Sequence, residues 1–497
     1  MRAINSSSTH NQLLDCKASY ILPHDETKPR VGGSDWRSMG MKSMFKFAGL
    51  GTVSALLINA AAVAQEVTDG QVSTYVDNTY LFLIGGLIVM FMAAGFMCLE
   101  AGLVRSKNAA MQSMKNIALF SVAGIMFWIV GYSFAYPGEF LLGGWLGGTP
   151  GPQSFSPGEL GDVVGEDGTV GYAPASDWFF QMVFVATAAS IVSGTVAERV
   201  KLVPFLLFTA VLTAFIYPVV ASWEWGTGAL DQMGFSDFAG STLVHSTGGW
   251  AALIGALIIG PRLGKYDGGK IHPMPGSNIP LAGLGTFVLW FGWFGFNGAS
   301  QLAAGTLSDI NSVAVIFVNT NMAAAGGVVA SLILTSVLYK GKVDATLVFN
   351  GAIGGLVAIT AEPLLPSVLD AVLIGGVGGV LVVLTVPLLD KFKIDDVVGA
   401  IPAHLVCGIW GTLAVALNTA VTKTVDGEEV EVVVFSISQL GVQAAGVLAT
   451  AVFVSAASAA VWMLLKVTMG VRVSDEDQEA GLDKTEVGLE AYPEFAN

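Results

Sequence analysis

Two histidines, His245 and His404, lie within long apolar segments of the 497-residue chain. An ionisable side chain in such a segment is a functional candidate, because burying it is costly. Each neutral imidazole has one nitrogen that donates a hydrogen bond and one that accepts. The alternative is that both are structural residues, each bonded to a neighbouring helix. No Cys, Asp or Glu accompanies either histidine as a further ligand, and a structural zinc site takes four, so we expect no metal and no cofactor.

Composition shows which elements must position these histidines. The chain is 53% hydrophobic and 12% charged, whereas a soluble domain carries about 25% charged residues. Apolar runs such as 80–99, 116–136 and 371–389 can each cross a hydrocarbon core of about 30 Å, which takes about 20 helical residues. Although the net charge is −15, no nucleic-acid motif or basic stripe is present. We therefore predict a protein of the lipid bilayer that does not bind nucleic acid.

The first 64 residues are set apart from this fold. Residues 1–40 lack apolar periodicity, which indicates an unstructured extension or a start codon placed too early. Residues 41–64 have the order of a secretory signal peptide: Lys42 and Lys46, an apolar stretch, and a small-residue end at 62–64. The mature chain is then expected to begin at Gln65, and an uncleaved first helix is the alternative.

From Gln65 onward, hydropathy predicts eleven membrane-spanning helices and therefore an all-α polytopic fold. The expected spans are 79–103, 116–136, 178–197, 203–222, 238–260, 278–297, 311–338, 344–362, 366–389, 397–418 and 434–466. Lys and Arg follow the odd-numbered spans, as Arg105 follows the first, whereas Lys423 alone lies on the opposite side. By the positive-inside rule, the mature N-terminus is outside and the C-terminus cytoplasmic. We expect a membrane domain at 65–470 and a cytoplasmic tail at 471–497.

The two histidines occupy matched positions in this scheme. Eleven spans divide as five, five and one, and an odd-numbered half forces the second half to run inverted, as in many transporters. His245 lies seven residues into the fifth span and His404 seven residues into the tenth, so each is about 10 Å deep at 1.5 Å per residue. Because the two helices enter from opposite faces, both imidazoles are expected to approach the midplane.

Other candidate residues lie near the outer end of the fifth span. Asp237 begins that span, where a carboxylate is expected to cap exposed backbone amides, with attraction of cations as a secondary effect. The aromatic residues near the outer mouth include Trp225, Phe184 and Phe296. Most membrane aromatics pack or form an interfacial belt, but a ring face also attracts cations.

Several longer stretches resemble signatures of the ammonium transporter (Amt/Mep/Rh) family, in its bacterial Amt-like form. They are 102–108 (GLVRSKN), 237–245 (DFAGSTLVH), 293–297 (WFGFN), and 395–396 (DD) ahead of 404–411 (HLVCGIWG). The resemblance runs from about residue 75 to the end. It implies a homotrimer in which each subunit has its own pore.

The resemblance also assigns roles residue by residue. The matched positions are the twin pore histidines His245 and His404, the phenylalanine gate Phe184 and Phe296, the outer cation-recruitment site Trp225 and Ser300, and its supporting aspartate Asp237. The implied function is transport rather than enzymatic catalysis. Ammonium would be recruited at the outer mouth and deprotonated, and ammonia would pass the histidines through an apolar pore, with or without the proton.

Two departures and two alternatives accompany this interpretation. Pro402 and Leu405 stand where many members have small residues, so we expect a kinked helix and a narrower lumen there. The tail resembles the regulatory C-terminus that receives a PII-type signalling protein in many bacterial members, but Val487 replaces a frequent histidine.

The alternatives are an ammonium sensor and a neutral gas channel of the Rh branch. The short tail argues against a sensor, and the Trp225–Ser300 pair argues against the Rh branch.

Overall fold

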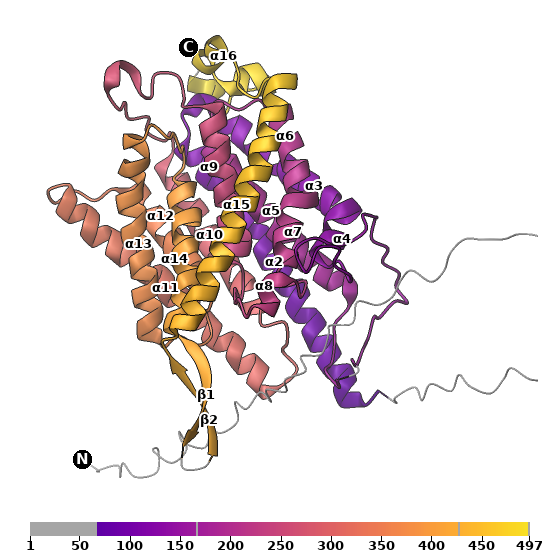
Figure 1. Ribbon diagram of the computed structural model, residues 1–497. Helices are drawn as coiled ribbons and strands as arrows, with labels where there is room; N and C mark the ends of the chain where they lie inside the picture. The colour runs from indigo at the N-terminus through magenta and orange to yellow at the C-terminus, as the bar shows by residue number, and fades with distance from the viewer. Residues whose placement is uncertain (1–66, 166, 426–427, 496–497) are drawn as a thin grey trace, which may run out of the picture.

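The computed structural model describes residues 67–165, 167–425 and 428–495, and shows long helices standing side by side in a bundle (Figure 1). The extension at 1–40 and the signal peptide expected at 41–64 lie outside the described residues. The chain end that carries α16 (Asp475–Ala480) lies at one end of the bundle, here called the tail end. A small hairpin marks the opposite end, here called the hairpin end.

The helices of the described residues are long and apolar. Nine segments are long and apolar enough to cross a membrane: Asp69–Leu103, Ser106–Ala135, Pro174–Thr195, Leu202–Ser222, Ser241–Ile259, Ile279–Ala299, Leu307–Leu338, Val368–Lys391 and Ile437–Thr468. Their main helices are α2 (Asp69–Leu103), α3 (Ala109–Met126), α4 (Tyr132–Ala135), α5 (Pro174–Thr195), α6 (Leu202–Val211), α7 (Tyr217–Ser222), α9 (Thr247–Ile259), α10 (Ile279–Ala299), α11 (Leu307–Leu338), α13 (Val368–Lys391) and α15 (Ile437–Thr468). The polytopic helical membrane fold predicted from the sequence is confirmed.

Two expected spans are shorter than the rest. The eighth corresponds to α12 (Ala345–Ile359), and the tenth to the segment Ile401–Leu417, which includes α14 (Cys407–Ala414). Fifteen helical residues extend only about 22 Å at 1.5 Å per residue, less than a hydrocarbon core of about 30 Å. The count of eleven spans therefore stays a prediction.

The start of α2 shows what the hydropathy pattern missed. The helix begins at Asp69, ten residues before the expected span. Thr68 and Gln71 form a capping box in which the Thr68 hydroxyl accepts from the Gln71 backbone N–H and the Gln71 side chain accepts from Thr68 N. This exchange fixes a helix start in a polar segment.

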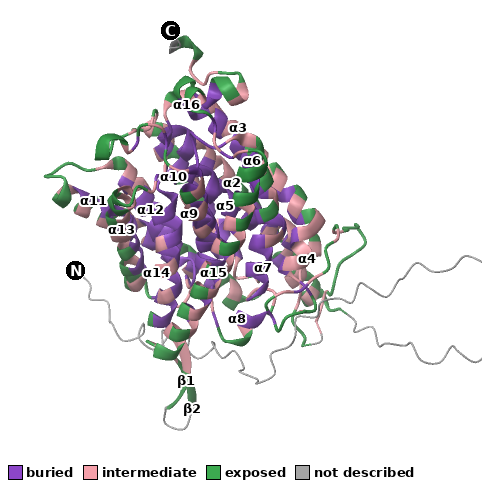
Figure 2. Cartoon of the chain, turned by 45° about the horizontal axis from the view of Figure 1, so that its top comes forward, coloured by how far each residue is buried: buried purple, intermediate pink, exposed green. Residues whose placement is uncertain are grey.

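Close backbone packing joins α11, α12 and α13. A Cβ at Gly327 would lie 2.1 Å from the carbonyl oxygen of Gly351, and one at Gly375 would lie 2.0 Å from that of Ala323. Only glycine permits such approach, which is how membrane helices gain packing without a hydrophobic driving force. The cartoon of burial shows the interior of the bundle buried and the outward faces of the helices partly exposed (Figure 2).

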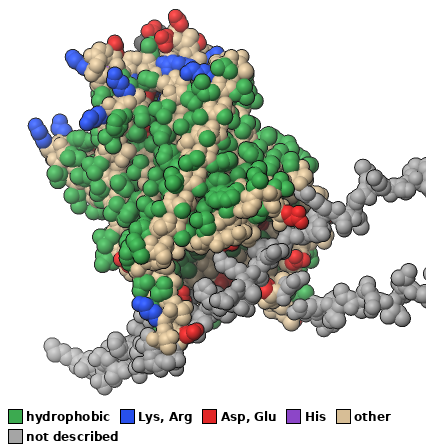
Figure 3. Space-filling view, viewed as in Figure 1, with side chains coloured by type: hydrophobic (Ala, Val, Ile, Leu, Met, Phe, Trp, Pro, Cys, Tyr) green, Lys and Arg blue, Asp and Glu red, His purple; other side chains and the backbone are tan. Residues whose placement is uncertain are grey.

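A β-hairpin at the hairpin end was not expected from the sequence. Strands β1 (Thr419–Val425) and β2 (Glu428–Val434) pair antiparallel, with Thr419 opposite Val434. Valine and threonine favour strands, and residues 419–433 fall between the tenth and eleventh expected spans, where hydropathy does not detect short strands; β2 also takes in Val434, the first residue expected in the eleventh span. On the face seen in Figure 3, hydrophobic side chains form a broad belt, and Lys and Arg gather mainly above it, at the tail end.

Candidate functional site

The two histidines meet in the interior of the bundle. His245 lies on the π-helical turn η5 (Ser241–Ser246) and His404 on η7 (Ile401–Val406). Their Nδ1 atoms are 3.3 Å apart and their ring centroids 5.3 Å apart. The exposed fractions are 0% and 2%. Because the two Nδ1 atoms face each other, one must carry a proton and donate while the other accepts. The Nε2 atom of His245 is buried and has no hydrogen-bond partner among the described residues.

The two turns are positioned by matching carboxylates. Asp237, eight residues before His245, accepts hydrogen bonds from the backbone N–H groups of four successive residues, 240–243, at 2.7–3.1 Å. Asp396, eight residues before His404, accepts from Ile401 N at 2.7 Å and from Thr195 Oγ1 at 3.0 Å. Each carboxylate thus satisfies free amides at the start of its helix. The expected capping by Asp237 is present, whereas the sequence interpretation had given Asp396 no role, although its identical spacing was visible.

The two histidine-bearing helices run in opposite directions. The chain beyond α9 reaches the tail end, where Arg472 Nη1 donates to the carbonyl oxygen of Pro261. The chain beyond α14 reaches the hairpin end and enters β1. They cross closely, since a Cβ at Gly249 would lie 2.6 Å from the Cβ of Leu405. Pro402 falls in the first turn of its helix, where a missing N–H costs little.

A column of aromatic rings leads to the histidines from the hairpin end. Phe184 on α5 and Phe296 on α10 stack with centroids 3.9 Å apart and planes 16° apart. The Trp225 ring lies 6.0 Å from Phe184, and the Phe296 ring lies 5.3 Å from His245. Both phenylalanines are fully buried, and the Phe296 ring contacts both Phe184 and His245. The structure therefore brings together five of the seven residues selected from the sequence: Trp225, Phe184, Phe296, His245 and His404.

The remaining two lie beside the column. Asp237 contacts it through its backbone, because Trp225 Nε1 donates to the Asp237 carbonyl oxygen at 3.2 Å. Ser300 ends α10, and its hydroxyl donates to the carbonyl oxygen of Phe296 at 2.7 Å. That bond uses the hydroxyl proton and leaves the oxygen lone pairs as acceptors. Trp225 thus lies beside Phe184 and Ser300 beside Phe296, and an aromatic face together with an acceptor oxygen would suit a small cation.

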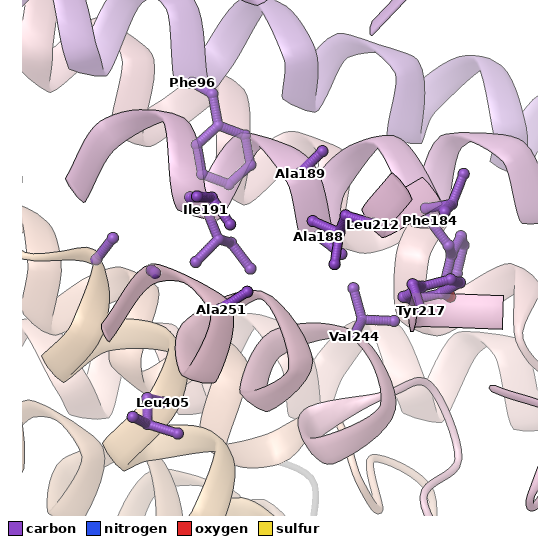
Figure 4. Close-up of a cluster of buried hydrophobic side chains, with 14 of the residues drawn as sticks. Phe96, Phe184, Ala188, Ala189, Ile191, Leu212, Tyr217, Val244, Ala251 and Leu405 are labelled. Atoms are coloured by element: carbon purple, nitrogen blue, oxygen red, sulfur yellow. The ribbon is translucent and has the colours of Figure 1, made fainter. Parts of the chain in front are cut away.

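Two further rings complete the site. Trp293 stacks on His245 with centroids 5.0 Å apart, and the Phe96 ring lies 5.8 Å from that of His404. The sequence interpretation missed both roles: Trp293 stood inside a noted motif, and Phe96 carried no signal beyond an apolar run. In the close-up, Phe184 and Tyr217 lie at one end of an apolar cluster, and Phe96, Ile191 and Leu405 lie at the other (Figure 4). The histidines are therefore surrounded by apolar and aromatic side chains.

Comparison with known proteins agrees with this arrangement. The model of the Ammonium Transporter Family matches residues 80–492. The chain belongs to the ammonium transporter family. It is 40% identical to ammonium transporter Amt2 of Archaeoglobus fulgidus over 434 residues, which cover 83% of this chain and 87% of that protein. It is 33% identical to the ammonium transporter of Bacillus subtilis over 425 residues, which cover 84% and 98% of the two chains.

Solved structures of the family share the fold. A structure described as a sensor Amt protein matches with a TM-score of 0.73 at 34% identity, over 83% of this chain and 98% of that one. Mep2 of Candida albicans matches with a TM-score of 0.70 at 26% identity, over 82% and 89%. Members of the ammonium transporter family are transporters rather than enzymes.

In this ammonium transporter the tail is attached to the tail end of the bundle by its carboxylates. Asp483 accepts hydrogen bonds from Ala110 N at 3.1 Å and Met111 N at 2.8 Å, in the first turn of α3. Glu486 Oε2 accepts from Leu202 N at 3.1 Å, at the start of α6. Burial is the larger influence on the pKa of Asp483 and raises it, against the backbone donors that lower it. The tail thus satisfies the free amides of two membrane helices.

Proposed function

We propose that this protein takes ammonium from the hairpin end, removes its proton, and passes ammonia beyond the buried histidine pair toward the tail end. The observation that carries this proposal is the 3.3 Å contact between His245 Nδ1 and His404 Nδ1, at the inner end of the closed aromatic column. A cation costs at least ~2.5–3.5 kcal/mol at the centre of a bilayer, so an apolar path favours the neutral form.

Recruitment is assigned to the entrance of the column. The Trp225 and Phe184 rings offer faces to a cation, each worth ~0.5–2 kcal/mol, and the Ser300 oxygen accepts an N–H. Asp237 supports this site through the bond from Trp225 Nε1 to its carbonyl oxygen, 3.2 Å long. Opening of the stacked pair Phe184 and Phe296 would then admit the substrate to the histidines.

Deprotonation provides the selectivity. Potassium resembles ammonium in charge and size, but it has no proton to lose. A path that only the neutral form can follow therefore excludes potassium by chemistry rather than by pore diameter. In each neutral imidazole, Nε2 has the opposite hydrogen-bonding role to Nδ1. The ring that donates through Nδ1 accepts at Nε2, and the other ring donates at Nε2, so the pair presents one donor and one acceptor to the passing molecule.

The distribution of charge supports an orientation in the membrane. Lys and Arg side chains gather at the tail end (Figure 3), which we assign to the cytoplasm by the positive-inside rule. The hairpin end is then outside, in a bacterial inner membrane. We further propose a homotrimer with one pore per subunit, and a tail surface that binds a PII-type signalling protein.

A sensor is the second candidate, favoured by the 34% identity to the sensor Amt structure. The two functions differ in flux: a transporter moves substrate across a membrane without another protein, whereas a sensor need not. A neutral gas channel of the Rh branch would carry flux without responding to changes at Trp225 or Ser300.

The decisive experiment uses the purified full chain in proteoliposomes. We expect an ammonium gradient to evoke current and labelled methylammonium to accumulate, with no response to potassium. Absence of both signals from correctly inserted protein would reject transport and favour the sensor. Flux that does not respond to Trp225→Leu would favour the gas channel.

A further inference from the structure

A buried carboxylate on α5 has no basic partner. Asp177 lies in the first turn of this helix and is 6% exposed. Its Oδ2 atom accepts a hydrogen bond of 2.6 Å from the Tyr132 hydroxyl, and the Gln181 side chain supplies another. Within the part of the chain that the structure describes, no Lys, Arg or His side chain forms an ion pair with it. The mechanism proposed above does not use this residue.

The short bond from Tyr132 is that of a charged acceptor. An O–H donor lies ~2.5–2.7 Å from a carboxylate oxygen, whereas ~2.7–2.8 Å is usual for a neutral one. A buried carboxylate is costly unless other groups compensate its charge. Asp237 shows the usual compensation, because four backbone N–H groups donate to it. Among the described residues, none donates to Asp177, whose negative charge is held by two neutral side chains.

This charge lies on the outer side of the phenylalanine pair. Asp177 and Phe184 are seven residues apart on α5, so they share one face and are separated by about 10 Å along the axis. α5 ends close to the tail, where Val473 N donates to the Arg199 carbonyl oxygen. Its first turn is therefore directed toward the hairpin end, from which the proposed function takes ammonium.

Aromatic rings continue from Phe184 toward this charge. The Phe180 ring lies 4.6 Å from that of Phe184, the Phe82 ring 5.3 Å from that of Phe180, and the Tyr172 ring 4.1 Å from that of Phe82. Tyr172 is near enough to Asp177 to interact with its charge. Phe180 and Phe82 are 1% and 0% exposed. Because these rings exclude water, the field of the carboxylate is weakly screened on its way to Phe184.

We propose that Asp177 is a positioning residue for ammonium recruitment, whose uncompensated charge draws the cation to the faces of Trp225 and Phe184. The bound cation in turn supplies the counter-charge that the described residues do not provide. Asp177 acts through space and does not touch the substrate. This inference rests on the proposed function, and it adds a preference for the charged form of the substrate before deprotonation.

An acidic residue in a first helical turn also stabilises its helix through the helix dipole. That structural role depends on how the carboxylate is held, whereas the proposed role depends on its charge. The two can be separated, because the charge belongs to Asp177 and the short hydrogen bond is donated by Tyr132. Substitutions of these two residues therefore give different results under the two roles.

The first test measures the ammonium dependence of the current for the full chain in proteoliposomes. Asp177→Asn keeps the size of the side chain and removes its charge. The half-saturating concentration should rise about tenfold, the effect of one charge ~10 Å away at an effective dielectric constant of ~20. The maximal current should stay close to that of the wild type, because the change affects binding of the cation and not the later steps.

Two control variants accompany Asp177→Asn. Tyr132→Phe removes the hydroxyl and keeps the charge, so it should bind ammonium at least as well as the wild type. Glu159→Gln removes an exposed acidic side chain of the outer loop. Its charge is screened by water, so this variant should also keep the wild-type half-saturating concentration.

A second pair of variants serves if Asp177→Asn misfolds. Tyr172→Lys places an ammonium group near the carboxylate and gives it a counter-charge, so the half-saturating concentration should again rise about tenfold. Tyr172→Gln removes the same ring without adding a charge. It should change the affinity much less than Tyr172→Lys does.

The outcomes separate this inference from the proposed function. Equal losses of affinity in Asp177→Asn and Tyr132→Phe would mean a structural role and overturn the inference, as would equal losses in Tyr172→Lys and Tyr172→Gln. If Trp225→Leu weakened the affinity and Asp177→Asn did not, recruitment at Trp225 would stand and Asp177 would have no part in it. Wild-type protein that carried neither current nor labelled methylammonium would overturn the proposed function itself.

Discussion

Asp237 and Asp396 occupy equivalent positions in two helices that run in opposite directions. Each lies eight residues before a buried histidine and accepts backbone N–H bonds at the start of a π-helical turn. Asp237 differs in one respect, because its carbonyl oxygen also receives Trp225 Nε1. The same capping chemistry thus supports both histidines, and the Asp237 residue also holds the Trp225 ring beside Phe184.

This difference predicts that replacing Asp237 and replacing Asp396 have distinct effects. Asp237→Ala and Asp396→Ala should each lower stability by ~1–3 kcal/mol, because buried N–H groups lose their acceptor. Only Asp237→Ala should also weaken the apparent affinity for ammonium. Loss of the cap should shift the backbone at position 237, and with it the carbonyl oxygen that receives Trp225 Nε1. Thermal unfolding and the substrate dependence of the current measure the two effects. Equal affinity changes in both variants would contradict the role of the Trp225 bond.

Acid should destabilise the protein through Asp395. Burial alone would raise the pKa of Asp395, but Arg199 and Arg262 beside it hold that pKa well below its usual range. Arg262 makes two side-chain bonds to the carboxylate, each 2.9 Å long. A carboxyl whose pKa is lower in the folded state stabilises the fold above its unfolded pKa of ~3.9. That contribution is lost as the pH falls from there toward the folded pKa.

Asp395→Asn should therefore lower the melting temperature at neutral pH and flatten its decline between pH ~5 and ~2. Removing one partner of a buried pair typically costs ~3–5 kcal/mol. Asp390→Asn is the control, because Asp390 bonds Lys265 at a partly exposed position, 26% for the Asp390 side chain. A melting profile of Asp395→Asn that parallels the wild type at every pH would contradict this assignment.

The tail should dock through Asp483. Asp483→Asn exchanges one acceptor oxygen for a donor that faces the amides of Ala110 and Met111, so the tail should detach more readily from α3. We expect faster proteolysis after residue 474 and altered activity, with unchanged selectivity for ammonium over potassium. Asp475→Asn, whose side chain is 64% exposed, should behave like the wild type. If Asp483→Asn lost binding of a PII-type protein and Asp475→Asn kept it, the docked tail would also form part of the surface that binds this partner.

The sequence predicted those parts of the site that depend on helix direction and composition. Matched depths in opposed spans placed His245 and His404 together, and the apolar runs located the helices that hold them. Residue types could not show the π-helical turns, because these depend on how Asp237 and Asp396 bind the first free amides. Phe96 was also missed, since its place at the site arises from its contact with His404 on another helix.

The histidine pair carries the sharpest prediction. In His245→Ala or His404→Ala, the remaining imidazole loses the 3.3 Å contact between the two Nδ1 atoms. An unpaired buried polar group costs ~1–3 kcal/mol, and the vacated space admits water that hydrated potassium could follow. Each variant should therefore stop conducting or lose selectivity for ammonium over potassium.

Trp225→Leu provides the contrast, because it removes an aromatic face at the entrance and leaves the histidines in place. It should weaken apparent affinity by the ~0.5–2 kcal/mol of a cation–π contact and keep selectivity. Currents for both ions, recorded from reconstituted wild type and the three variants, separate the two roles. If both single histidine variants kept the wild-type rate and selectivity, the pair would be structural, and deprotonation would have to occur elsewhere along the column, between Trp225 and Phe296.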